Sequence, residues 1–390
     1  MSPNTDFVPF ARPSLGKEEE DAVVSVLRSG WLTTGAVALD FEREFSAFVG
    51  TEYALAVNSA TSGLHLALEA VGVGPGDRVV TSPYTFAATA AAARHLGAEV
   101  EFCDVVRGGY NLDPARLEDV LKKTRNVRVI LPVHVGGLPC AMDEICRLAS
   151  LYGCAVVEDA AHSFPSRLPV GYAGTLGDIG VFSFYATKTI TTGDGGMVVT
   201  RDPRLARRMS IMRNHGIDRP VWDRYTSRTA SWTYSVIEAG FKYNLPDILA
   251  AIGREQLRKA ERFLEERRAI AGIYLAAFKN LSFVEPPPDG PGNAWHLYPL
   301  RLLPGSLRTD REGFMERLRD AGVGTSVHFI PLHTMPYWAV RYGLEPDSFP
   351  EAIESFRRTV SLPIWQGMGT DRARKVADAV SEAGASLPAF

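Results

Sequence analysis

Short runs of valine and isoleucine alternate with segments of helical periodicity from Tyr53 onward, and this alternation constrains the fold more than any other feature of the chain. Strands are expected at residues 53–57, 78–82, 127–133, 154–159, 179–184 and 195–200, and helices at residues 62–70, 86–96 and 142–151. Strands that alternate with helices form a parallel sheet with helices on both faces. Bound ligands then gather at the carboxyl ends of the strands.

The carboxyl-terminal third has a different order of elements. A long helical stretch from Pro246 to Phe278 leads out of the strand-rich region, and prolines at 286–288 with glycines at 290 and 292 mark a loop. Beyond the loop we expect a strand at 295–302, a helix at 310–321, a strand at 325–330 and a further helix. Single cores stop growing at roughly 250–300 residues. We therefore expect a large domain, residues 1–252, and a small α+β domain, residues 253–390.

Charge and hydropathy argue against several classes of protein. The net charge of −3 provides no basic field, so no nucleic-acid partner is expected. The longest apolar stretch, Phe86 to Ala93, falls far short of the roughly 20 residues that span a bilayer. Residues 1–12 lack the basic start and apolar run of a secretory signal. We expect no membrane insertion and a cytoplasmic location.

The cysteines and histidines show no spacing typical of a metal site. No C-x-x-C pair occurs among Cys103, Cys140, Cys146 and Cys154, so these cysteines are expected to be reduced and structural. No H-x-x-x-H pattern occurs among His134, His162, His215, His296, His328 and His333. No metal is expected.

Lys188 lies between an apolar strand and a glycine-rich turn that leads into the next strand. Most lysines are solvated surface groups, and that interpretation stays open. A lysine at a strand end, between Phe184 and Ile190, is instead expected to be partly desolvated. Desolvation lowers the pKa of the amine from its ordinary value of about 10.4 and frees the amine to attack a carbonyl.

A second strand carries Glu158 and Asp159 to its carboxyl end, with His162 shortly after it. Asp159 is a candidate helix cap, which is a common structural role. It is also a candidate for the buried carboxylate that pyridoxal phosphate (PLP) needs opposite its pyridine nitrogen, because the protonated ring is the electron sink in transamination.

A third segment, residues 57–69, joins a strand to an amphipathic helix through small polar residues. Thr61, Ser62 and Gly63 place hydroxyls and backbone N–H groups at a helix N-terminus, where a phosphate can bind. Simple helix capping is the alternative. Together the three segments supply an amine, a ring-nitrogen partner and a phosphate site within one α/β domain.

A series of segments in order makes the pattern specific: GWLTTG at residues 30–35, then SPYTFAAT, VEDAAH, SFYATK, TTGDGGM, GFKYNLPDI and SVHFIPLH. In these the chain resembles the DegT/StrS-type family of PLP-dependent nucleotide-sugar aminotransferases, a branch of the aspartate aminotransferase type I fold. The resemblance implies a mostly parallel, seven-stranded sheet between helices and a smaller α+β domain after it.

The resemblance also implies roles for residues around the cofactor ring. Lys188 would be the Schiff-base lysine and proton carrier, and Asp159 the partner of the pyridinium nitrogen. Phe86 would stack on the ring, although a core position is the alternative for a phenylalanine among alanines. His162 would lie near the ring.

For the cofactor phosphate, the resemblance implies contacts from Thr61, Ser62 and Ser183. Asn244 of the GFKYN segment would join them from a second subunit, which implies a homodimer with shared active sites. Without the resemblance, Ser183 is a polar residue on a mixed strand and Asn244 simply precedes a helix start.

The implied reaction has two stages. An amino acid, with L-glutamate expected, converts PLP to pyridoxamine phosphate, and the keto group of a nucleotide-diphosphate sugar then takes the nitrogen. The GFKYN and SVHFIPLHTMPYW segments resemble the subgroup acting at C4 of UDP-linked 4-keto sugars, of the 4-amino-4-deoxy-L-arabinose type. Candidate substrate contacts are Trp31, Thr33, His328, His333 and Tyr337.

Other functions of the same fold stay open. A 3-keto sugar is the alternative acceptor. Relatives that dehydrate sugars replace the lysine by histidine, and Lys188 therefore favours transamination. A PLP-dependent aromatising synthase and a non-catalytic regulator are further alternatives, and an intact Lys188 and Asp159 argue against the regulator.

Overall fold

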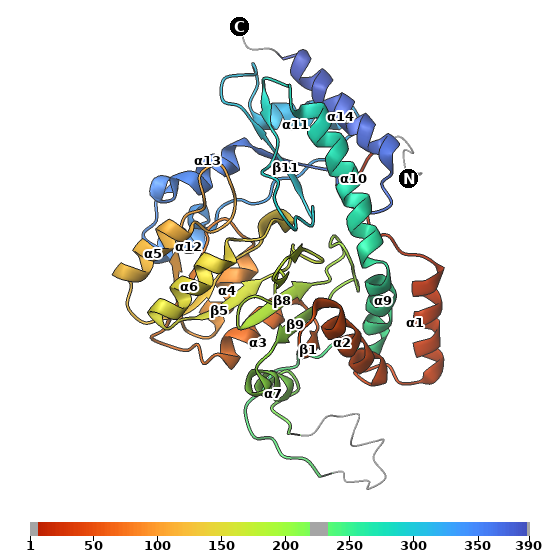
Figure 1. Cartoon of the computed structure of the whole chain (residues 1–390), viewed down its shortest axis with the longest axis vertical. Helices are drawn as coiled ribbons and strands as arrows, with labels where there is room; N and C mark the ends of the chain where they lie inside the picture. Colours follow the sequence, from red (N-terminus) through yellow and green to blue (C-terminus); the bar gives the residue numbers. More distant parts are fainter. Residues whose placement is uncertain (1–6, 219–232, 388–390) are drawn as a thin grey trace.

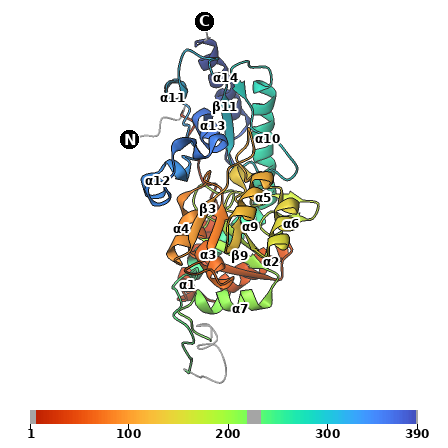
Figure 2. The ribbon, with the colours of Figure 1, turned by 90° about the vertical axis from the view of Figure 1, so that its left-hand side faces the viewer.

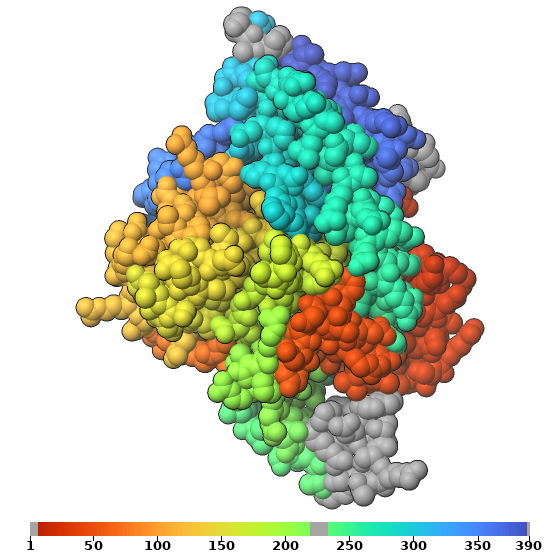
Figure 3. All heavy atoms as spheres, in the orientation of Figure 1, coloured from red at the N-terminus to blue at the C-terminus, as the bar shows by residue number. Residues whose placement is uncertain are grey.

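The computed structural model describes residues 7–218 and 233–387. A large domain built on a twisted sheet lies below a smaller domain that contains the C-terminal helix, and the two views agree on this arrangement (Figures 1 and 2). Figure 3 shows atoms of the small domain lying directly against the large domain along their boundary.

The large domain contains a seven-stranded sheet in the order β1-β9-β8-β5-β4-β2-β3. Its strands are β1 (Tyr53–Val57), β2 (Arg78–Thr81), β3 (Glu99–Phe102), β4 (Val127–Leu131), β5 (Ala155–Asp159), β8 (Ile179–Ser183) and β9 (Gly196–Thr200). Strand β9 runs antiparallel to β1 and β8, and the other pairs are parallel. The expected mostly parallel sheet is confirmed. Edge strand β3 was not expected.

Alternating side chains of each strand pack into separate hydrophobic cores on the two faces of the sheet. On β8, Val181 packs in a core with α3, whereas Phe182 packs in another with α2. The same division holds on β4, where Val129 and Ile130 belong to different cores. The helices of this domain are α1 (Lys17–Ser29), α2 (Ala36–Val49), α3 (Ala60–Ala70), α4 (Ala87–His95), α5 (Pro114–Lys123), α6 (Met142–Tyr152), α7 (Pro203–Met212) and α9 (Asp247–Arg258).

The small domain packs helices against a three-stranded antiparallel sheet, β10-β11-β12. Its strands are β10 (Val284–Glu285), β11 (Tyr298–Leu302) and β12 (Thr359–Leu362), and its helices are α10 (Ala260–Phe278), α11 (Arg311–Asp320), α12 (Pro336–Tyr342), α13 (Pro350–Arg358) and α14 (Thr370–Ala385). A two-stranded ribbon, β6 (Arg167–Leu168) and β7 (Gly171–Tyr172), lies before β8.

Two expectations for the small domain need correction. The strand expected at 325–330 is wrong. This segment makes one isolated bridge, between Ser326 and Ser361, and residues 326–329 line a pocket instead of joining a sheet. The strand expected at 295–302 begins only at Tyr298, because Trp295 has a φ of 49° and breaks the extended conformation before it.

The chain passes between the domains at Lys259, where α9 ends and α10 begins. The boundary expected after residue 252 therefore falls inside α9. The first described residues also depart from the expected division, because Val8 pairs with Val323 and packs in the small-domain core.

Candidate active site

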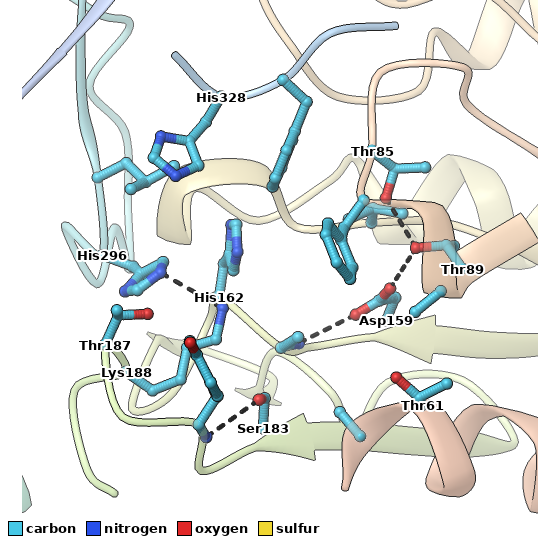
Figure 4. A pocket seen from close by; sticks show the side chains of 18 of the residues that line it. Thr61, Thr85, Thr89, Asp159, His162, Ser183, Thr187, Lys188, His296 and His328 are labelled. Atoms are coloured by element: carbon cyan, nitrogen blue, oxygen red, sulfur yellow. Dashed lines mark hydrogen bonds between the residues drawn. The ribbon is translucent and has the colours of Figure 1, made fainter. Parts of the chain in front are cut away.

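A pocket of about 740 Å³ lies at the carboxyl ends of β5 and β8, between the two domains (Figure 4). We call it the central pocket. From the large domain it is lined by the first turns of α3 and α4 and by the turn after β8, and from the small domain by residues 326–329 and Ile364. Seven of the residues singled out from the sequence line it: Thr61, Phe86, Asp159, His162, Ser183, Lys188 and His328.

Lys188 enters the central pocket from the turn that joins β8 to β9. Its backbone N–H donates to the carbonyl of Tyr185 at 2.9 Å, which fixes the turn. Burial lowers the pKa of the Lys188 amine to about 7, with Arg267 acting in the same direction and Asp159 opposing it. Near neutral pH a large fraction of this amine is therefore uncharged and nucleophilic.

Asp159, the last residue of β5, presents a carboxylate with only 5% exposure to the same pocket. The Thr89 hydroxyl donates to Oδ2 at 2.7 Å, and the Ala161 N–H donates to Oδ1 at 3.2 Å. Thr85 extends this arrangement, since its hydroxyl lies 2.7 Å from that of Thr89. Burial raises the pKa of Asp159, and the hydrogen bonds oppose this rise. The carboxylate is thus held in one orientation.

The start of α3 forms a small polar cradle beside β9. Ser59 caps the helix by accepting from the Ser62 N–H at 3.1 Å, and Thr61 lines the pocket. A Cβ on Gly196 would lie 2.9 Å from the Ala60 nitrogen, so only glycine lets β9 pass this closely. Ser183 reaches the pocket from the end of β8. The N–H groups and hydroxyls gathered here suit an anion.

Aromatic rings form the opposite walls. Phe86 is 64% exposed at the start of α4, with its ring 6.4 Å from that of Phe329. Phe329 also stacks on His162, with ring centroids 5.5 Å apart. His328 stacks on Phe10, and its Nδ1 lies 3.1 Å from the Ser361 hydroxyl. The exposure of Phe86 argues against the alternative of a core position.

Ser62 lies beside the central pocket without lining it. Its hydroxyl is 2.6 Å from Asn58 Oδ1 and 2.8 Å from the Ser59 carbonyl. The phosphate contact expected of Ser62 stays a prediction, and the structure brings Ser59 to the pocket instead.

Three other predicted residues gather around a second cavity of about 510 Å³, lined by Thr33 and Asn244 among others. The Asn244 side-chain amide donates to the Thr34 hydroxyl and accepts from the Lys242 amine. The indole N–H of Trp31 donates to the Thr34 carbonyl at 3.2 Å. Within one chain these residues do not line the central pocket.

His333 and Tyr337 also lie outside the central pocket. The His333 ring is buried, and its Nε2 lies 2.9 Å from the Pro346 carbonyl. Tyr337 is 55% exposed at the start of α12 and packs against Trp338. Their contacts with substrate stay predictions.

Sequence reasoning missed Thr89 and His296 as pocket residues. Thr89 follows Thr85 by one helical turn in the SPYTFAAT segment, so the spacing was a usable signal. His296 Nε2 lies 3.5 Å from the Lys188 amine, although 108 residues separate the two in the sequence. No local pattern connects them.

Within residues 7–218 and 233–387, no group of three or more histidine, cysteine or acidic side chains could hold a metal ion. In the same described ranges, no helix has both the length and the apolar character needed to span a bilayer.

Comparisons with known proteins extend over almost the whole chain. The model of the DegT/DnrJ/EryC1/StrS aminotransferase family matches residues 13–381. The spore coat polysaccharide biosynthesis protein SpsC of Bacillus subtilis is 41% identical over 379 residues, covering 96% of this chain and 97% of SpsC.

Two solved structures show how closely the fold matches. Spr1654 of Streptococcus pneumoniae, in its PMP form, has a TM-score of 0.90 at 26% identity and covers 97% of this chain and 99% of its own; its PLP form gives 0.89. Helicobacter pylori PseC, an aminotransferase involved in the biosynthesis of pseudoaminic acid, has a TM-score of 0.90 at 26% identity and covers 98% of this chain and 100% of its own.

Proposed function

Because this chain belongs to the DegT/DnrJ/EryC1/StrS aminotransferase family, whose members are PLP-dependent sugar aminotransferases, we propose that it moves an amino group from L-glutamate to the keto carbon of a UDP-linked 4-keto sugar. Lys188 and Asp159 are the residues on which the proposal rests. The observation that carries it is their convergence: the end of β5 brings a fixed carboxylate, and the turn after the neighbouring strand β8 brings an amine of lowered pKa, to one pocket.

The residues of the central pocket fit PLP. The α3 N-terminus, Thr61 and Ser183 offer N–H groups and hydroxyls to a phosphate, and the absence of a side chain at Gly196 leaves β9 close beneath them. Asp159 offers a buried carboxylate for the ring nitrogen, and Phe86 offers an exposed aromatic face. Lys188 supplies the amine that binds an aldehyde.

When bound, PLP acts as an electron sink that makes the α-carbon of the amino acid acidic. Lys188 Nζ then removes the proton from that carbon, which requires an uncharged amine and agrees with a pKa lowered to about 7. With the sugar, the same nitrogen returns a proton to the carbon that receives the amino group. One base at one position therefore acts in both halves of the reaction.

Asp159 keeps the ring nitrogen protonated in this proposal. It accepts hydrogen bonds from Thr89 and Ala161, and these favour the charged carboxylate against the effect of burial. His162 packs beside the site through its stack on Phe329. His328 faces the pocket from the small domain and is the proposed contact for substrate.

We further propose a homodimer in which Asn244 completes the cofactor site of a second subunit. Asn244, Thr33 and Trp31 lie together near the second cavity, away from the central pocket of their own chain. A cluster with that arrangement suits residues that serve a neighbouring active site. Size measurement in solution, with Asn244→Ala tested for weaker PLP binding, examines this part.

The experiment that tests the main proposal is the absorbance spectrum of the wild type and Lys188→Ala, recorded before and after adding glutamate. A yellow cofactor band that glutamate bleaches in the wild type, and that Lys188→Ala lacks, is the expected result. The absence of any band after PLP supplementation would overturn the proposal.

Acceptor choice is tested separately with a panel of nucleotide-linked sugars. Turnover of UDP-linked 4-keto sugars is expected, whereas turnover of a 3-keto sugar alone would replace the C4 assignment with the C3 alternative. Recovery of a dehydrated product would move the assignment to the dehydratases, which Lys188 disfavours.

A further inference from the structure

His296 occupies the wall of the central pocket beside Lys188, and the proposed function leaves it without a role. Its ring is 6% exposed and its Nε2 lies 3.5 Å from the Lys188 Nζ (Figure 4). The other ring nitrogen, Nδ1, is buried and has no hydrogen-bond partner among residues 7–218 and 233–387. The contact of Nε2 with the Lys188 amine is therefore the side-chain interaction that distinguishes the two ring nitrogens of His296 within the described residues.

The backbone of His296 is fixed by an unusual interaction. Arg267, on α10, is 1% exposed, and its guanidinium donates to the carbonyls of Trp295 at 3.0 Å and His296 at 3.2 Å. The same group donates to the carbonyl of Ile364 at 2.9 Å. A planar group with several fixed donors holds these carbonyls in one arrangement. The segment that carries His296 is therefore rigidly attached to the small domain.

The ring itself has little freedom. The His162 ring lies 4.4 Å away between centroids, on the pocket side. Burial, together with the charges of Lys188 and Arg267, lowers the pKa of His296 well below its ordinary value. The ring is consequently neutral, and Nε2 can accept a hydrogen bond when the ring proton is on Nδ1.

The rest of the inference takes the proposed role of Lys188 as its premise. We propose that His296 is a positioning residue for the Lys188 amine: Nε2 accepts one N–H of the lysine when the lysine is free, and this directs the nitrogen lone pair toward the reacting carbon. Only a hydrogen bond forms in this contact. The proton that Lys188 takes from the amino acid stays on Lys188 until it is delivered, and His296 carries no net proton.

Several groups besides His296 surround the Lys188 amine, and a test must separate their effects on its pKa from that of His296. Burial lowers the pKa of the amine, Asp159 raises it and Arg267 lowers it, and His162 and His328 line the same pocket. A substitution at His296 keeps Asp159 and the backbone contacts of Arg267, but it changes the ring that packs against His162. Comparing a variant that lacks an acceptor with one that keeps an acceptor therefore separates the lost hydrogen bond from a shift of the His162 ring.

The experiment uses the full-length protein loaded with pyridoxamine phosphate, in which the lysine is free. Competitive acetylation of Lys188 between pH 5 and 10, followed by mass spectrometry, measures the pKa of its amine in wild type, His296→Phe and His296→Gln. An acceptor stabilises the ammonium form, so His296→Phe is expected to lower this pKa and His296→Gln to restore part of it.

Turnover provides a second readout. His296→Phe is expected to lower kcat on the order of 10-fold to 100-fold, the size of effect produced when a reacting group is misplaced. KM for the sugar is expected to stay unchanged, because the proposed contact is with lysine. His65→Gln is the matched control: it removes a histidine that is also buried but lies outside the central pocket, and it is expected to leave the pKa of Lys188 unchanged.

Two outcomes would overturn the inference. One is an unchanged Lys188 pKa and kcat in His296→Phe. The other is a loss of kcat that follows thermal stability equally in the Phe and Gln variants, since that indicates a structural role. If His296→Phe fails to fold, the inference is still tested by comparing the Lys188 pKa and kcat of His296→Gln with those of the wild type. Turnover by Lys188→Ala would instead overturn the proposed function.

Discussion

Glu158 and Asp159 are consecutive residues of β5 whose carboxylates serve opposite faces of the sheet. Asp159 faces the central pocket, while Glu158 is fully buried behind it. The His134 Nε2–H donates to Glu158 Oε2 at 2.9 Å, because Nδ1 of the same ring accepts from the Cys140 N–H at 3.1 Å. Glu158 thereby anchors the strand end that presents Asp159.

Glu158→Gln is predicted to destabilise the protein strongly. The carboxylate also accepts N–H groups from Gly174, Leu176 and Gly177, at 2.8, 2.6 and 2.6 Å. A glutamine amide has one acceptor oxygen, whereas the carboxylate has two, because the second oxygen is replaced by an NH2 donor. Some of the buried N–H groups are therefore left without an acceptor. Each buried donor left without an acceptor costs about 1–3 kcal/mol. Denaturant unfolding measures the loss.

The matched control for this prediction is Glu144→Gln. Glu144 is an exposed glutamate on α6 whose partner is Arg147. Exposed pairs contribute about 0–1 kcal/mol, so little change is expected. Equal unfolding midpoints for the two variants would contradict the role assigned to Glu158.

Thr89→Val is predicted to reduce turnover while the protein still binds PLP. The Thr89 hydroxyl donates to Asp159 Oδ2 at 2.7 Å, and hydrogen bonds to charged groups contribute about 1.5–3 kcal/mol. Its loss raises the pKa of Asp159 and weakens the hold on the ring nitrogen. The cofactor absorbance and kcat measured on the same preparation check this, and Thr89→Ser should recover most of the rate. An unchanged kcat in Thr89→Val would remove Thr89 from the site.

The parallel sheet was predictable because its signal is local. Most of the strands are short apolar runs followed by a helical pattern. Asp159 at the end of β5 and Lys188 in the turn after β8 then lie at the edge where the carboxyl ends of the parallel strands meet. The segment 325–330 has the same β-branched character and yet pairs only through Ser326. Strand formation there depends on a distant partner, which no local pattern encodes.

The supporting residues of the site were missed for a similar reason. Thr89 meets Asp159 across 70 residues, and His296 meets Lys188 across 108. Both contacts arise from packing of separate elements. Thr89 lies within a recognisable segment, but its contact with Asp159, like that of His296 with Lys188, is found only when the fold is known.

The rate at which cofactor-free protein takes up PLP is predicted to rise with pH and level off above about 7. Only the uncharged amine attacks an aldehyde, and burial lowers the pKa of Lys188 to about 7. Below that value the uncharged fraction falls about tenfold for each pH unit. Stopped-flow absorbance between pH 5.5 and 9 measures the rate. A rate that still rises steadily up to pH 9 would show an ordinary lysine.

The same lowered pKa predicts the sign of a stability change. The folded state binds fewer protons at Lys188 than the unfolded state between about pH 7 and the ordinary lysine value of 10.5. Stability of the cofactor-free protein therefore gains a contribution that increases with pH across this window. Lys188→Met removes that contribution. Unfolding of wild type and Lys188→Met at pH 7 and 9 should show a smaller pH-dependent rise in the variant.

Gly196→Ala is predicted to weaken PLP binding and the fold together. The added Cβ would lie 2.7 Å from the Phe182 carbonyl oxygen and 2.9 Å from the Ala60 nitrogen, so β9 or the start of α3 must move. Overpacking of this kind costs about 1–3 kcal/mol. Gly272→Ala is the control, because a Cβ there meets nothing within 4 Å on α10 and alanine favours a helix by about 0.5–1 kcal/mol. A Gly196→Ala protein that keeps wild-type PLP affinity would contradict the prediction, because it would show that the N–H groups at the start of α3 are not displaced by the added Cβ.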